Sequence, residues 1–153
     1  MNTALASLLA AYPRQHPLRW RFALACVERV QHLLENAEVN AQLAVLRGFV
    51  DGVCDREMLE QAATRAAHLA TRHPGSVSID GAAHAAVSAT HAVAKALAGR
   101  VEQAADYAAY AAVYAYAAHA VTDPDAFAGE HAWQRDTWQA LVNAGARHPP
   151  VWA

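Results

Sequence analysis

The chain has 153 residues, of which 55% are hydrophobic and 17% are charged, and its formal net charge is −2 at pH 7. This balance excludes intrinsic disorder, which requires low hydrophobicity and high net charge. It also argues against non-specific nucleic-acid binding, which depends on a basic patch.

Helical structure is favoured throughout, because 40 residues are alanine, the strongest helix former, and no segment alternates apolar and polar residues as a strand does. We therefore predict an all-α fold, a single-domain antiparallel helical bundle of about seven helices. The domain is expected to span residues 1–153, with its core at about 18–145 and an extended C-terminal tail at 146–153.

The first three helices are separated by proline and polar residues. Pro13 and Pro17 end the first helix. The second is predicted over residues 18–35, with an apolar stripe made by Trp20, Leu24, Val27, Val30 and Leu34. The third, over residues 38–53, has apolar residues at steps of four and three, namely Val39, Leu43, Leu46, Val50 and Val53. This spacing predicts a seam for packing against other helices.

The next three helices differ from these in composition. Asp55 is expected to cap a fourth helix that ends at residues 73–75. Alanine lies on every face of residues 81–98 and 101–120, which predicts two helices buried on more than one side at the centre of the bundle. Gly99 can adopt the left-handed conformation between them.

The last helix is predicted to begin with Asp123 as its N-cap and Pro124 as its first residue, and to end at Gly145. Its core face is expected to consist of Phe127, Trp138, Leu141 and Val142.

The cysteines and the apolar segments indicate where in the cell the protein is located. Cys26 and Cys54 fall within apolar helical patterns and lack metal-ligand spacing, so we expect free thiols in the cytoplasm. No basic segment precedes the apolar residues 4–11, which therefore do not resemble a secretory signal. The longest uncharged run, residues 107–122, falls short of the roughly 20 strongly apolar residues that span a bilayer. We expect no membrane association.

Histidines and aspartates form the first candidate site. Asp80, His84 and His91 share about one helical face, while Asp106 and His119 lie on the next helix. Such a face could ligate a metal or relay protons. Because the H-x-x-x-H and E-x-x-H spacings of helical metal sites are absent, we predict no cofactor and keep the first three residues only as metal candidates. The alternative is that these histidines form hydrogen bonds beside an alanine-rich core.

Tyrosines form a second candidate site. Tyr107, Tyr110 and Tyr114 are three and four residues apart and so form a ridge on an alanine-rich helix. Rigid amphipathic rings are favoured at protein interfaces, so the ridge could contact a partner. It could equally pack against alanine grooves with its hydroxyl groups in solvent.

An acidic surface is the third candidate. Residues 28–60 contain seven acidic residues and three arginines. Such a surface could steer a basic partner, or it could be an ordinary solvated helix face. The residues that we select as partner-binding candidates here are Asp51, Asp55, Glu57 and Glu60.

Three segments carry a resemblance to a known family. Leu24–Val30 reads L-A-C-V-E-R-V, residues 82–93 form a run of small residues and histidines, and Glu130–Gln134 reads E-H-A-W-Q. In this order and spacing, over about residues 18–142, the chain resembles an all-helical, alanine-rich family of immunity proteins from bacterial polymorphic-toxin systems. The resemblance implies a protein that neutralises a toxin and has no catalytic activity.

The sequence contains no motif for nucleophilic catalysis, phosphate binding or dinucleotide binding, so we do not predict an enzyme. With the resemblance, it predicts a cytoplasmic immunity protein that binds a cognate bacterial toxin, with neither nucleic acid nor membrane as a partner. Two alternatives stay open. One is a structural or self-associating helical module that forms homo-oligomers, and the other is a metal or small-molecule enzyme that uses His84 and His91.

Overall fold

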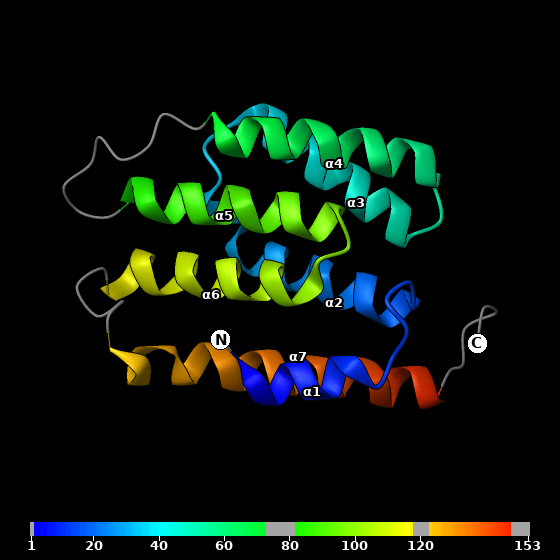
Figure 1. The fold of residues 1–153 in the computed structure, drawn as a ribbon, viewed down its shortest axis with the longest axis vertical. Helices are drawn as coiled ribbons and strands as arrows, with labels where there is room; N and C mark the ends of the chain where they lie inside the picture. Colours follow the sequence, from blue (N-terminus) through cyan, green and yellow to red (C-terminus); the bar gives the residue numbers. More distant parts are fainter. Residues whose placement is uncertain (1, 73–81, 118–122, 148–153) are drawn as a thin grey trace.

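The computed structural model of the chain describes residues 2–72, 82–117 and 123–147, and these residues form seven α-helices and no strand. The all-α helical bundle is thereby confirmed (Figure 1). The helices are α1 (Thr3–Ala10), α2 (Pro17–Val30), α3 (Ala37–Val50), α4 (Arg56–Thr71), α5 (Ala82–Leu97), α6 (Val101–Ala117) and α7 (Ala128–Arg147). Two short 3-10 turns accompany them, η1 (Gln31–Leu33) and η3 (Pro124–Phe127).

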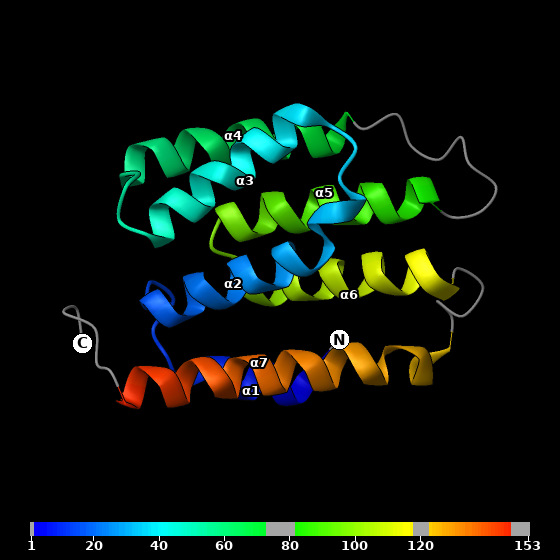
Figure 2. The same ribbon diagram turned by 180° about the vertical axis from the view of Figure 1, so that it is seen from behind.

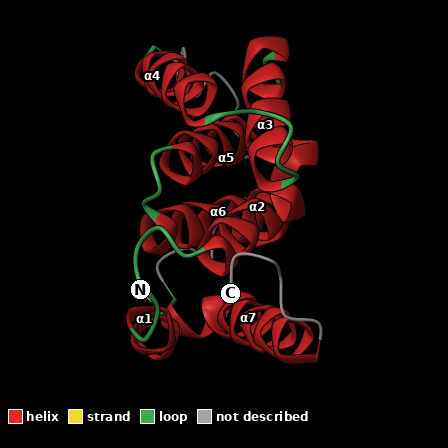
Figure 3. Ribbon diagram, turned by 90° about the vertical axis from the view of Figure 1, so that its right-hand side faces the viewer, coloured by secondary structure: helices red, strands yellow, loops and turns green. Residues whose placement is uncertain are grey.

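The helices form two layers, which Figure 3 shows end-on. One layer contains α4, α5, α6 and α1, and the other contains α3, α2 and α7, which lie in front in Figure 2. In the first layer α5 and α6 lie in the middle, between α4 and α1 (Figure 1). No helix within the described ranges is long and apolar enough to cross a bilayer.

Alanine explains why α5 and α6 occupy the centre. Methyl groups on several faces of each helix are buried, and because each side chain is a single methyl, the helix backbones can approach closely. The expected central position of these two helices is confirmed. The alanines buried most completely are Ala89, Ala92 and Ala96 on α5 and Ala104 and Ala111 on α6.

The turn between α5 and α6 depends on Gly99. Its φ of +76° lies in the left-handed region, as the sequence predicted, and the N–H of Arg100 donates to the Lys95 carbonyl at 2.9 Å. A Cβ atom at Gly99 would lie 3.2 Å from Cη2 of Trp20, which is buried. Glycine is therefore favoured at this position for two reasons: other residues rarely adopt its backbone conformation, and a side chain would crowd the Trp20 indole.

Gly99→Ala is expected to destabilise the fold more than Gly52→Ala does. Both glycines have positive φ, so each alanine costs about 1–2 kcal/mol in the left-handed region. Nothing lies within 4 Å of a Cβ atom at Gly52, whereas Gly99→Ala must also displace Trp20. Urea denaturation of the two variants measures the difference, and equal losses of unfolding free energy would contradict this account of the turn.

Two predictions about α2 and α3 need correction. The stripe residues of α2 are buried or half-buried as expected, but α2 ends at Val30 and the chain turns through η1, so the helix does not reach residue 35. Likewise α3 ends at Val50, and Val53 is 81% exposed, not part of the seam. The cause is the left-handed Gly52, after which the N–H groups of Val53 and Cys54 both donate to the Gly48 carbonyl, at 2.7 and 3.0 Å.

The two ends of α7 also differ from the prediction. Asp123 does act as a cap, accepting from the Asp125 N–H at 3.0 Å, but it caps η3, which leads into α7. Gly145 does not end the helix, which continues to Arg147. Residues 146 and 147, which were expected to begin the extended tail, are therefore helical. A Cβ atom at Gly145 would be 3.7 Å from Leu18, an ordinary van der Waals contact. Residues 148–153 lie outside the described part of the chain.

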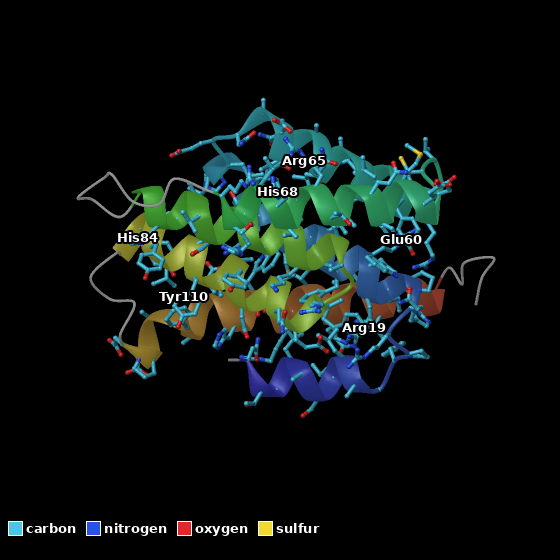
Figure 4. All side chains as sticks on the ribbon, turned by 45° about the horizontal axis from the view of Figure 1, so that its top comes forward. Arg19, Glu60, Arg65, His68, His84 and Tyr110 are labelled. Carbon is cyan, nitrogen blue, oxygen red and sulfur yellow. The ribbon has the colours of Figure 1, made fainter. Side chains whose placement is uncertain are left out.

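A buried arginine links α1 and α2 to α6. Arg19, labelled in Figure 4, has a side chain that is 5% exposed. It donates to the Leu9 carbonyl at 2.8 Å and to both carboxylate oxygens of Glu102, at 3.0 and 3.3 Å. Two guanidinium nitrogens thus have partners from two other helices, which fixes α1 against the bundle.

Both cysteines are free. Cys26 is fully buried on α2, and burial raises the pKa of its thiol, so the reactive thiolate is disfavoured. The sequence pattern predicted that Cys54 lies within a helix. In the structure it is half-buried in the turn after α3, so that prediction was wrong.

Candidate functional site

The histidine and tyrosine candidates lie together, along the outer side of α5 and α6. His84 stacks on Tyr114 with ring centroids 5.3 Å apart, and His91 stacks on Tyr107 at 5.0 Å. The interplanar angles are 21° and 18°. Because α5 and α6 run antiparallel, moving seven residues forward along α5 and seven residues back along α6 leads from the first ring pair to the second. What the sequence presented as two separate candidates is therefore a single feature.

The row of rings continues onto the last part of the fold. Tyr110 lies 6.2 Å from Tyr114 and meets Phe127 of η3 edge-to-face at 5.0 Å. The Phe127 ring lies in turn 5.9 Å from that of His131 on α7. Figure 4 shows His84 and Tyr110 on the same side of the molecule. We call these seven residues the aromatic face: His84, His91, Tyr107, Tyr110, Tyr114, Phe127 and His131.

The aromatic face is only partly buried. Tyr110 is 44% exposed, His84 is exposed, and the other members are half-buried. The seam between α5 and α6 is already filled by alanine, so these rings pack against one another outside it. The tyrosines thus pack against neighbouring rings and stay partly exposed, and their contact with a partner stays a prediction.

Two hollows border the aromatic face. One, of about 300 Å³, lies between α6, η3 and α7, and its wall includes Asp106, Tyr110, Phe127 and His131. The other, of about 380 Å³, lies between α5 and α6 and includes Lys95. They share Asp106 and Tyr110, so these two residues separate one hollow from the other.

Burial shifts two titratable groups in the first hollow. It raises the pKa of the half-buried Asp106 carboxyl, although the charges of the N-terminus and of His131 and a hydrogen bond from the Asn2 backbone act in the opposite direction. It also lowers the pKa of His131, although Asp106 opposes that shift. The hollow therefore disfavours charge on both side chains, and their mutual attraction does not fully compensate for it.

Of the histidine and aspartate candidates, the metal candidate Asp80 and also His119 lie outside the described residues. Within the described ranges, no three histidine, cysteine, aspartate or glutamate side chains gather closely enough to hold a metal ion. His84 and His91 are in contact with tyrosine rings.

The acidic candidates lie on a different surface from the tyrosines. Asp51, Asp55, Glu57 and Glu60 are all exposed around the turn between α3 and α4. Asp55 has a structural role, since its carboxylate accepts from the Met58 N–H at 2.9 Å and caps α4 as predicted. Figure 4 shows Glu60 and Tyr110 toward opposite ends of the molecule. The acidic and aromatic candidates therefore do not form one binding surface.

Two members of the aromatic face, Phe127 and His131, were not among the residues predicted from the sequence to form a site. Phe127 was assigned to the core of the last helix, and His131 was not singled out. Their spacing of four residues would place them on one helical face, which was the available signal. Their link to Tyr110 depends on how α7 packs against α6, which helical periodicity does not reveal.

Two of the three segments that carry the family resemblance, Leu24–Val30 and Glu130–Gln134, contact each other. Arg29 of the first segment donates to both carboxylate oxygens of Glu130 in the last, at 2.8 and 3.1 Å, and its guanidinium lies 4.3 Å from the centre of the Trp133 ring. Gln134 of the same segment donates to the Ala105 carbonyl at 2.9 Å. These residues therefore hold α7 against α2 and α6.

Searches with the whole chain found no matching family model, no matching curated protein and no matching solved structure. The resemblance to immunity proteins therefore stays a prediction from the sequence.

Proposed function

We propose that this protein is a non-catalytic binding protein of the immunity type, which neutralises a cognate toxin protein by covering part of its surface with the aromatic face. The observation that carries this proposal is the gathering of seven histidine, tyrosine and phenylalanine rings on α5, α6, η3 and α7. Five of them contact one another in succession, namely His84, Tyr114, Tyr110, Phe127 and His131. His91 and Tyr107 form a separate stacked pair, and Tyr107 lines the same hollow as Tyr110.

Such a face suits protein recognition for an energetic reason. Aromatic side chains bury large areas on binding and have few rotatable bonds, so they lose little conformational entropy. Here the rings already support one another in stacked and edge-to-face pairs, and they stand on helices whose alanine seam is buried. A preorganised surface of this kind reduces the cost of association.

The charge around the aromatic face favours a basic partner. Residues 101–153 contain six acidic residues and two arginines. Two of these acids, Glu102 and Glu130, pair with Arg19 and Arg29, and Lys95 lies in the second hollow, so the acidic charge near the face comes from the remaining aspartates. Asp123 and Asp125 are exposed at η3, beside Phe127, and Asp106 lies next to Tyr110 in the wall of the hollow. Complementary charge would speed association and select among partners. A cytoplasmic location, which we propose from the free thiols, is consistent with this role.

The experiment uses two forms of the full chain as bait in lysate of the source organism, the wild type and Tyr110→Ala/Tyr114→Ala. The proposal expects the wild type alone to retain one basic protein, which then forms an equimolar complex when both proteins are purified. Alanine is compatible with α6, so the variant should fold. A matched control is Tyr116→Ala, because Tyr116 is 61% exposed on the same helix but outside the aromatic face.

Self-association is the outcome that would replace this proposal. If sedimentation shows that the purified wild type dimerises in the absence of any other protein, and Tyr110→Ala/Tyr114→Ala abolishes the dimer, the aromatic face joins copies of this chain. A retained protein that binds both baits equally would also contradict the proposal.

A further inference from the structure

The hollow beside Tyr110 combines a carboxylate with aromatic walls. It has a volume of about 300 Å³ and is lined by side chains from three elements, α6, η3 and α7. Tyr110 and Phe127 meet edge-to-face at 5.0 Å, and Pro124 completes the apolar part of the wall. Asp106 lies one helical turn before Tyr110 on α6, so both residues face the same hollow.

Asp106 takes part in none of the four ion pairs formed within the described part of the chain, which are Arg19–Glu102, Arg29–Glu130, Arg47–Glu28 and Arg65–Glu38. The positive charge of the N-terminus and a hydrogen bond from the Asn2 backbone lower the pKa of its carboxyl, but they do not offset the effect of burial. Burial raises the pKa of its carboxyl, which means that the ionised form lacks full compensation. A cation that entered the hollow would supply that compensation. Burial and the positive charge of the N-terminus lower the pKa of His131, which favours the neutral imidazole over the cation.

The protein already holds an arginine in a setting of this kind. Arg29 forms two hydrogen bonds with Glu130 and lies 4.3 Å from the centre of the Trp133 ring, and these two partners are three residues apart on α7. Asp106 and Tyr110 offer the same combination, a carboxylate and a ring one turn apart on a helix. Arg29 thus shows which side chain fits a carboxylate next to an aromatic ring.

We propose that this hollow receives an arginine side chain of the protein partner, whose guanidinium donates to the Asp106 carboxylate and lies against the rings of Tyr110 and Phe127. The inference rests on the proposed function, because it names the chemistry by which the aromatic face recognises its partner. Arginine is favoured over lysine because a planar guanidinium stacks on rings and binds a carboxylate through two N–H groups.

The first test needs no variant. The full chain, labelled with ¹⁵N, is titrated at low salt with N-acetyl-arginine amide, with the neutral isostere N-acetyl-citrulline amide and with N-acetyl-lysine amide. The arginine compound is expected to shift the amide signals of residues 106–110 and 127–131, and to bind at least about tenfold more tightly than the citrulline compound. Equal binding of the arginine and citrulline compounds, or shifts confined to other residues, would overturn the proposal. Equal binding of the lysine compound would overturn the choice of arginine.

The second test uses Asp106→Asn, with Asp136→Asn on the exposed face of α7 as its matched control. Asp106→Asn should abolish the preference for arginine over citrulline, and it should weaken binding of the purified partner by about tenfold. Asp136→Asn should change neither. If Asp106→Asn leaves partner affinity unchanged while Tyr110→Ala/Tyr114→Ala reduces it, the arginine site is wrong and the proposed function stands. If both variants bind the partner as the wild type does, the proposed function itself fails.

Discussion

Replacing Trp138 with alanine is expected to lower the free energy of unfolding by about 3–5 kcal/mol, the largest stability loss that we predict. Trp138 is 2% exposed on α7, and its indole meets Tyr12 edge-to-face at 5.2 Å and Phe22 at 5.7 Å. The residue thus joins α7 to α2 and to the segment that follows α1. Its removal leaves a cavity among rings that the backbone cannot close, and the lost free energy is a large part of the 5–15 kcal/mol typical of a domain.

A matched control for this prediction is Trp133→Ala on the same helix. Trp133 is half-buried, so its loss should cost less than half as much as the loss of Trp138. Chemical denaturation followed by far-ultraviolet circular dichroism measures both values. Similar losses for the two variants would show that α7 is not anchored through Trp138.

Replacing Arg29 with methionine is expected to cost about 3 kcal/mol at pH 7, because it leaves the Glu130 carboxylate without its partner. The Glu130 side chain is 8% exposed, whereas that of Arg29 is 36% exposed and so partly solvated before the change. The methionine keeps much of the aliphatic chain that packs near Trp133. The predicted loss therefore arises mainly from a buried charge that lacks compensation.

Removing the charge of Glu130 as well should restore stability, because no carboxylate then stays buried without a partner. The double variant Arg29→Met/Glu130→Gln should therefore recover most of the loss at pH 7. Urea denaturation of the single and double variants measures the difference, and equal losses would contradict this explanation.

The fold could be predicted from the sequence because its signals are local. Alanine on every face of residues 81–98 and 101–120 indicated that α5 and α6 are central, and Asp55 and Gly99 indicated a helix start and a helix end. The errors arose where one local signal overrode another. Gly52 ends α3 before Val53 can join the apolar stripe, whereas Gly145 stays helical although it resembled a stop signal.

The candidate site was predictable only in pieces. Helical spacing identified the tyrosines and the histidines, each on its own helix. It could not show that His84 meets Tyr114 and that His91 meets Tyr107, because this pairing depends on the register of α5 against α6. The contribution of Phe127 depends on a 3-10 turn whose position no periodicity indicated.

The measurement that tests the central claim most directly is a titration of the purified partner against variants of the two candidate surfaces. Tyr110→Ala/Tyr114→Ala should weaken binding by about 30-fold or more, as expected for rings at the centre of an interface. Glu57→Lys/Glu60→Lys, which reverses charge near the α3–α4 turn, should change the affinity less than about threefold, because exposed charges contribute little to affinity at physiological salt. The opposite pattern, with the glutamate variant weakened and the tyrosine variant unchanged, would contradict the assignment of binding to the aromatic face.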